Sequence, residues 1–133
     1  METHNILKTA VCESISGRST LTYQLSENTE DGSIYMRITE NTGNGYFSND
    51  WLKLDALIEQ AYYEKYITAI SINQFFSGRS VNTGAFLLAA LRQEGIITTS
   101  DVSKRAFVVH PELDIQQYLN ELKAPTKKVR KKS

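Results

Sequence analysis

The residues that most often carry chemistry in proteins are few in this chain and far apart. Its two histidines, His4 and His110, and its single cysteine, Cys12, lack the close spacing of zinc ligands. The chain contains neither the G-x-x-x-x-G-K-[ST] phosphate-binding loop nor a G-x-G-x-x-G motif after a strand. We therefore expect a protein that is not an enzyme and that binds no metal ion and no cofactor.

The charged side chains point instead to binding. The formal net charge is zero, but residues 1–66 hold ten acids and five bases, and residues 67–133 hold five acids and ten bases. Half of the second group of bases closes the chain: Lys127, Lys128, Arg130, Lys131 and Lys132. Such a basic arm is an electrostatic handle for an anionic partner. The alternative is a tail that only adds solubility.

Length and composition favour one soluble domain. The chain has 133 residues, about one domain's worth, with 41% hydrophobic and 23% charged residues, which is ordinary globular composition. It has no apolar run near the roughly 18 residues of a membrane span and no signal-peptide core. A lone cysteine fits a reducing compartment. We expect a cytoplasmic protein without membrane contact, folded as a single α+β domain over residues 1–123, with residues 124–133 as a disordered basic tail.

Hydrophobic periodicity predicts the elements of the first half. Apolar residues at helical spacing predict a short helix over residues 4–15. Two alternating segments, around residues 21–25 and 34–38, flank a turn-forming stretch and predict a β-hairpin with one apolar face.

A start signal at Ser48, with Phe47 placed to pack on Leu52, predicts a second helix to about residue 63. Its apolar stripe is expected to comprise Trp51, Leu54, Ile58 and Ala61. The tyrosines at its end suggest either a stacking platform or half-buried packing with a wet hydroxyl, and we favour the packing. These tyrosines are Tyr62, Tyr63 and Tyr66.

The second half opens with a capping box from Ser71 to Gln74, and the short helix that it predicts should stop at residues 77–79. A longer helix is expected from residue 80 or 81 to Glu94, ended by Gly95. Residues 96–99 and 105–109 then predict a second hairpin. Pro111 is expected to open a last helix, whose apolar side is Leu113, Tyr118, Leu119 and Leu122.

Residues 71–109 together form the most specific pattern in the chain. At its centre, Leu88, Leu91, Gly95, Ile96 and Ile97 resemble a Leu-x-x-Leu-x-x-x-Gly-Ile/Leu-Ile/Val pattern. This pattern ends the second helix of winged helix-turn-helix DNA-binding domains, where it locks the helix on the core and turns the chain into the wing. The resemblance covers the short helix, the glycine turn, the longer helix and the hairpin.

The resemblance implies that the helix from Ser80 is the recognition helix and that residues 98–108 are the wing. Recognition helices contact base edges with their N-terminal residues, and Arg and Asn suit guanine and adenine edges. The wing and the tail would contact phosphates. The implied nucleic-acid-binding residues are Arg79, Ser80, Asn82, Thr83, Lys104, Arg105, Lys127, Lys128, Arg130, Lys131 and Lys132.

The first hypothesis is therefore a small DNA-binding regulatory or accessory protein. It requires Leu88 and Leu91 in the core, with Asn82 and Thr83 substantially exposed. The helix is apolar almost all round, however, and could be buried instead. The acidic N-terminal half could then dimerise the protein or dock a partner protein, or it could simply complete the core. The second hypothesis is a non-enzymatic protein-interaction module with a winged-helix-like shape, such as an adaptor, an inhibitor or a complex subunit.

Overall fold

The computed structural model describes residues 3–43, 47–74 and 81–124. Within these ranges the elements follow one another as β1 (His4–Glu13), β2 (Thr20–Asn28), β3 (Ile34–Asn41), β4 (Leu52–Lys53), α1 (Leu54–Glu64), α2 (Ala69–Asn73), α3 (Val81–Gln93), β5 (Ile97–Thr99), β6 (Phe107–Val109) and α4 (Ile115–Leu122). Helices and antiparallel strands both contribute, so the fold belongs to the α+β class, as predicted.

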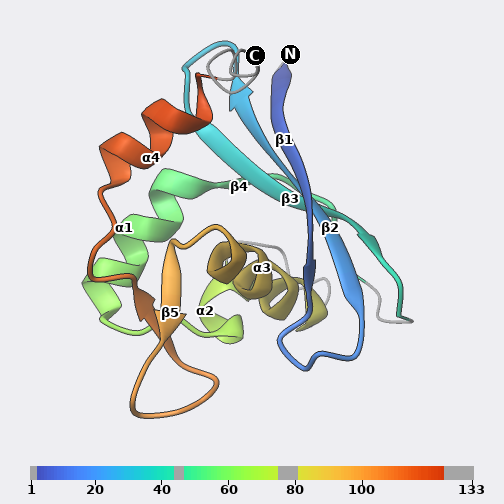
Figure 1. Ribbon diagram of the computed structural model, residues 1–133, viewed down its shortest axis with the longest axis vertical. Coiled ribbons are helices and arrows are strands. Elements are labelled where there is room, and N and C mark those ends of the chain that lie inside the picture. The colour runs from blue at the N-terminus through green and yellow to red at the C-terminus, as the bar shows by residue number, and fades with distance from the viewer. Residues whose placement is uncertain (1–2, 44–46, 75–80, 125–133) are drawn as a thin grey trace, which may run out of the picture.

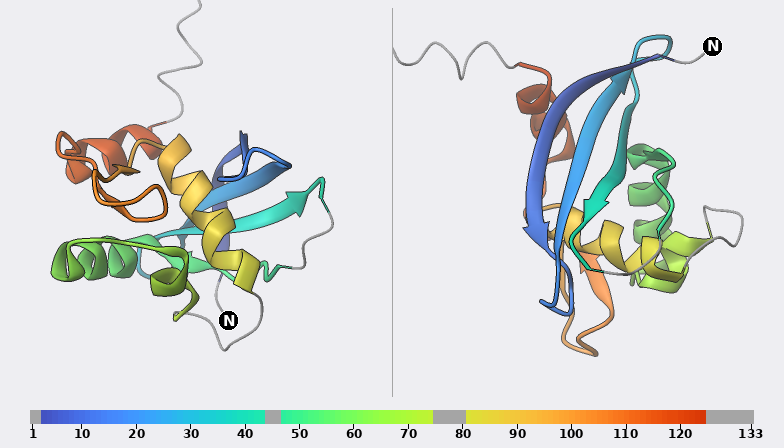
Figure 2. Two further views of the ribbon diagram at one scale, coloured as in Figure 1. Left: turned by 90° about the horizontal axis from the view of Figure 1, so that it is seen from below. Right: turned by 90° about the vertical axis from the view of Figure 1, so that its right-hand side faces the viewer.

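The strands form two antiparallel sheets. β1 to β4 lie side by side in chain order, and β5 pairs with β6 in a separate hairpin. The helices lie on one side of the larger sheet, with α3 packed directly against it (Figure 1). The opposite face of that sheet, turned toward the viewer in the right panel of Figure 2, is covered by no helix of the described ranges. We call it the outer face.

β2 and β3 form the hairpin that the alternating pattern predicts. Leu25 pairs with Met36, and Ser26 pairs with Tyr35. The apolar side chains of the two strands face the helices, and each is at most 1% exposed: Leu21, Tyr23, Leu25, Ile34, Met36 and Ile38. The prediction of one buried face and one polar face is confirmed.

The first element is a strand, so the prediction of a helix over residues 4–15 is wrong. β1 pairs with β2 along its whole length, and its register shifts between Ile6 and Lys8. A β-bulge adds a residue to one strand and interrupts the two-residue alternation of side chains. Ala10 therefore packs on the core, whereas Ile6 and Val11 are 42% and 57% exposed. The interrupted alternation imitates helical spacing.

α1 begins at Leu54 and not at Ser48. Its N-cap residue, Lys53, is the last residue of β4 and makes no side-chain cap, because a lysine ammonium has no acceptor for a helical N–H. The N–H of Ser48 donates to Thr83 Oγ1 at 2.9 Å instead of opening a helix. Trp51 consequently lies outside α1. The rest of the predicted stripe is buried as expected, namely Leu54, Ile58 and Ala61.

α2 begins earlier than predicted. Its capping box joins Thr68 and Ser71, whose side chains each accept from the other residue's backbone N–H, so the predicted box from Ser71 to Gln74 is wrong. The competing hydroxyl at Thr68 accepts from one of the first helical N–H groups, that of Ser71. The predicted end of this helix, at residues 77–79, lies outside the described residues.

α3 ends at Gln93, one residue before the predicted Glu94, and Gly95 terminates it as predicted. Gly95 adopts φ +81°, and the N–H of Ile96 donates to the carbonyl of Leu91 at 3.0 Å, which is the hydrogen bond of a Schellman C-cap. Leu88 and Leu91 are 3% and 0% exposed, so their predicted place in the core is confirmed.

α2 and α3 pack with their backbones in direct contact. A Cβ added to Gly84 would lie 2.2 Å from the carbonyl oxygen of Ala69. The N–H of Gly84 also donates to Asn73 Oδ1 at 2.9 Å. Glycine in the middle of a helix is unfavourable by itself, and this close approach explains why it stands here.

The second hairpin is present as predicted, with Thr98 opposite Val108. It is extended by an isolated antiparallel bridge between Ile67, in the connection from α1 to α2, and Phe107. This bridge joins the α1–α2 connection to the hairpin, while α1 also contacts β6 and α3 contacts both α2 and β5.

α4 begins at Ile115 after an Asp114 N-cap, so the prediction that Pro111 opens it is wrong. Its predicted apolar side does pack on the core: Leu113, Tyr118, Leu119 and Leu122. Beyond the helix, Lys123 Nζ donates to the carbonyl of Gly32 at 3.2 Å and lies 3.4 Å from the Glu27 carboxylate. The C-terminal end of α4 is thereby fixed to the β2–β3 connection.

Candidate functional site

The sheet and its β3–β4 connection cover the predicted recognition helix. Thr83 is 1% exposed and accepts from the N–H of Ser48, and the rings of Phe47 and Phe86 lie 5.9 Å apart. Asn82 is half-buried. The expectation that Asn82 and Thr83 are substantially exposed is therefore wrong for Thr83, because the N-terminal half packs onto the helix face that a DNA groove would need.

The described ranges include only part of the predicted nucleic-acid site. Lys104 and Arg105 are exposed in the loop between β5 and β6. This loop projects from the lower end of the molecule in Figure 1 and is braced by its own serines, since Arg105 N–H donates to Ser103 Oγ at 3.0 Å. The other predicted contacts lie outside the described residues: Arg79, Ser80, Lys127, Lys128, Arg130, Lys131 and Lys132.

The sequence did not indicate an aromatic and cationic cluster on the outer face. His4 of β1 stacks on Trp51, with ring centroids 4.3 Å apart and an interplanar angle of 16°. Tyr35 of β3 meets His4 edge-on at 4.9 Å, and Arg37 of β3 lies over Trp51 with its guanidinium carbon 4.2 Å from the ring centroid. We call these four residues the outer-face cluster.

Hydrogen bonds to β2 hold two members of this cluster. Ser26 Oγ lies 2.9 Å from His4 Nδ1. Gln24 Oε1 accepts from Arg37 Nε at 3.2 Å and from Arg37 Nη2 at 3.0 Å. The outer-face cluster thus spans the sheet from β1 to the residue before β4. Predicting which neighbouring strands pair could not reveal this cluster. Its two ends, His4 and Trp51, come together only because of the order of the four strands in the sheet.

Glu94, at the end of α3, is the centre of a buried polar network. Its side chain is 3% exposed and lies 2.8 Å from Lys8 Nζ. Tyr118 of α4 donates to it at 2.8 Å, and Tyr23 of β2 donates to it as well. Burial, followed by the hydrogen bond to Glu94, raises the pKa of Tyr23. Burial, followed by the charge of Glu94, raises the pKa of Tyr118.

This network is structural in character. It joins β1, β2, α3 and α4, and its carboxylate is closed off from solvent and already bound by a lysine and two hydroxyls. A buried charge is tolerated when it is paired and hydrogen-bonded in this way. Cys12 lies nearby and is also buried. Burial raises the pKa of its thiol against the smaller opposite effect of Arg92, so the thiol is a poor nucleophile.

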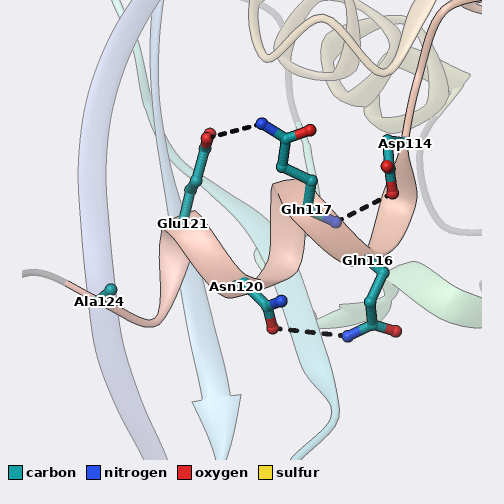
Figure 3. A pocket seen from close by; sticks show the side chains of 6 residues that line it. All are labelled: Asp114, Gln116, Gln117, Asn120, Glu121 and Ala124. Carbon is teal, nitrogen blue, oxygen red and sulfur yellow. Dashed lines mark hydrogen bonds between the residues drawn. The ribbon is translucent and has the colours of Figure 1, made fainter.

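A shallow open depression of about 430 Å³ runs along the exposed side of α4. Figure 3 shows that its polar side chains bond to one another along the helix, with Gln116 reaching Asn120 and Gln117 reaching Glu121. Its lining residues come from α4 and its two ends, so they do not converge on a ligand from separate elements. It does not have the form of an enclosed binding site.

Two of the three tyrosines around the end of α1 are more exposed than predicted. Tyr62 and Tyr63 are 64% and 87% exposed, and half-buried packing is therefore wrong for both. Tyr66 is half-buried, and Lys65 Nζ lies 5.5 Å from its ring centroid. Among the described residues no two tyrosine rings stack on one another, so ring geometry does not support the alternative of a preformed platform.

Two further features bear on function. Nowhere in the described ranges do three or more His, Cys, Asp or Glu side chains come together as a possible metal site. Within the same ranges, no helix has both the length and the apolar character required to cross a bilayer.

Comparison with known proteins does not supply a function. No protein-family model, no curated protein and no solved structure matches the chain. Its function must therefore be inferred from its own residues.

Proposed function

We propose that this chain is a non-enzymatic protein-interaction module and that the outer face of the β1–β4 sheet is its contact surface. One observation carries the proposal: the sheet packs on α3, and Thr83, which accepts from Ser48 in the β3–β4 connection, is buried. The helix that would read DNA is thereby used to hold the sheet in place. A sheet held in this way presents its other face as a rigid surface.

The chemistry of the outer face supports this role. Trp, Tyr and Arg are the residue types most enriched at the energetic centres of protein interfaces. Here Trp51, Tyr35 and Arg37 occur together with His4 on one face, and Trp51 and Tyr35 are partly exposed. The stacking and hydrogen bonds restrict their rotamers, which lowers the entropy lost on binding.

A site-specific crosslinking experiment tests the proposal. The photoreactive residue p-benzoylphenylalanine replaces Tyr35 on the outer face or, as a matched control, Tyr63, which is 87% exposed on α1. In cells of the source organism, we expect a discrete protein adduct from position 35 and none of that size from position 63. Equal labelling at both positions, or no adduct at position 35, would contradict the proposal.

A second candidate is sequence-independent binding of DNA, which the exposed Lys104 and Arg105 favour. The described loop would contribute phosphate contacts, together with the cations at residues 127–132. Base reading by Asn82 and Thr83 has no part in this version, because Thr83 is buried against the β3–β4 connection and Asn82 is half-buried. In this form of the winged-helix hypothesis, the DNA-binding regulatory role is retained, but the protein contacts only the phosphates of the DNA.

Fluorescence anisotropy with mixed-sequence duplexes tests this candidate at low salt. Replacing Lys104 and Arg105 by alanine should flatten the slope of log K against log salt by about 0.9 for each lost phosphate contact. Removing residues 127–133 should weaken binding to all sequences alike. A change of sequence preference on substituting Asn82 would instead restore the recognition-helix hypothesis.

A further inference from the structure

β1 is a long edge strand with a regular, unpaired side. Within the described residues it pairs only with β2, and the opposite edge of the sheet is the two-residue strand β4. Edge strands are usually protected by shortness, proline or a charged side chain, since their free N–H and C=O groups can recruit another strand. β4 is protected by its shortness, whereas β1 has ten residues and no proline.

The lysine that could protect this edge is used elsewhere. Lys8 is turned toward the helices, and its ammonium lies 2.8 Å from the buried Glu94 carboxylate. The register shift between Ile6 and Lys8 marks the start of the regular part of the edge. From Lys8 to Glu13 the pairing with β2 is uninterrupted.

Hydrogen bonding determines which backbone groups of β1 remain available. The N–H of Ser14 donates to the carbonyl of Ser19 at 2.9 Å, so Ser14 directs its backbone groups toward β2. Because these directions alternate along an antiparallel strand, Ala10 and Cys12 also face β2. Thr9, Val11 and Glu13 therefore direct their N–H and C=O groups away from the sheet.

We propose that β1 pairs antiparallel with β1 of a second copy of this chain, with the two-fold axis at Val11, to form one continuous sheet. This register places Val11 opposite Val11 of the second copy and Thr9 opposite Glu13 at both ends. All three outward-directed residues are then matched, giving about six main-chain hydrogen bonds. Registers centred one residue away leave part of this set unpaired.

The side chains favour the same register. Val11 is 57% exposed, and the axis places two such valines side by side on the outer face. Each Thr9 hydroxyl comes beside a Glu13 carboxylate, which it can bond as a cross-strand pair. The chain has zero formal net charge, so overall charge does not oppose the association. The inference rests on the proposed interaction role and names a partner for it, but it uses the sheet edge instead of the cluster.

Complementary charges at Val11 give a sharp test. The solution mass of the intact chain, measured by light scattering after gel filtration, should be twice 15.0 kDa. Val11→Lys and Val11→Glu should each be monomeric, because like charges meet at the axis, and an equimolar mixture of the two should recover the dimer. Val102→Lys is the matched control: Val102 is 61% exposed, between β5 and β6, and this variant should remain dimeric.

Three outcomes would overturn the self-pairing. They are a parent chain with the mass of one copy, a Val11→Lys variant that remains dimeric like Val102→Lys, and a mixture that stays monomeric. If β1 instead pairs with an extended segment of another protein, the purified chain alone has the mass of one copy, which is the first of these outcomes. The Tyr35 crosslink reports on the outer face independently, so either proposal can fail while the other stands. Circular dichroism confirms that each variant is folded.

Discussion

His4 and Trp51 stack at 4.3 Å across the outer face, which joins the first strand of the sheet to the residue that precedes its last strand. β2 and β3 lie between them in the sheet. The contact therefore links the two edges of the sheet across its outer face, which no helix of the described ranges covers.

A double-mutant cycle should measure this contact. His4→Ala, Trp51→Ala and the double variant, compared by urea unfolding, should give a coupling free energy of about 0.5–1.5 kcal/mol, the range for aromatic pairs. Tyr63→Ala, at a highly exposed position, should change stability by less than about 0.5 kcal/mol. Additive effects of the two substitutions would show that the stacked pair does not couple β1 to β4.

The contact between α2 and α3 predicts an inverted effect at Gly84. Glycine to alanine inside a helix ordinarily stabilises by up to about 1 kcal/mol. At Gly84 the new methyl group would meet the Ala69 carbonyl, so we expect a loss of about 1–3 kcal/mol from overpacking. Thermal and urea unfolding both report it. A neutral or stabilised variant would mean that the two helices separate at no cost.

The network around Glu94 predicts a loss of stability at alkaline pH. The pKa values of Tyr23 and Tyr118 are raised in the folded chain, whereas tyrosine in the unfolded chain titrates near its usual value of about 10. Above that pH the unfolded chain releases protons first, so the free energy of unfolding falls as pH rises, and it is fully retained below.

Urea titrations on both sides of the usual tyrosine pKa should reveal this dependence. Tyr118→Phe should flatten it, because one of the two tyrosines with a raised pKa is gone, and Tyr63→Phe should leave it unchanged. An equally steep decline in Tyr118→Phe would exclude Tyr118 as a source of the pH dependence.

The thiol of Cys12 should react slowly in the native chain. It is 7% exposed, and burial raises its pKa, so both access and thiolate fraction are reduced. Reaction with a disulfide reagent at mildly alkaline pH should accelerate strongly in urea. Native-state labelling as fast as that of the unfolded chain would place the thiol at the surface.

Local patterns predicted the second half of the fold well because it is built from local signals. Gly95 ends α3 through its own positive φ, and the β5–β6 hairpin joins segments close in sequence. The starts of α2 and α4 were misplaced by local caps at Thr68 and Asp114, whereas the failures in the first half have tertiary causes. The bulge after Ile6 hid β1, and the short strand β4 displaced the start of α1 beyond Trp51.

The candidate sites depend on the same distinction. The sequence shows that α3 is apolar almost all round. It does not show which segment covers the helix, because Ser48, which contacts Thr83, lies far away in the sequence. The outer-face cluster likewise depends on strand order, which brings His4 to Trp51. Exposed loop cations such as Lys104 and Arg105 were foreseeable, since a polar connection between two short strands lies at the surface.

The β2–β3 connection holds both ends of the described chain. The N–H of Thr29 donates to the carbonyl of Thr3 at 2.9 Å, and Lys123 donates to the carbonyl of Gly32. The fold is therefore almost cyclic in its topology: a short covalent linker could join the two ends, and new termini could be opened in the exposed β5–β6 loop. Such a circular permutant would retain every strand pairing described above, because the order of strands in space does not depend on where the chain is cut.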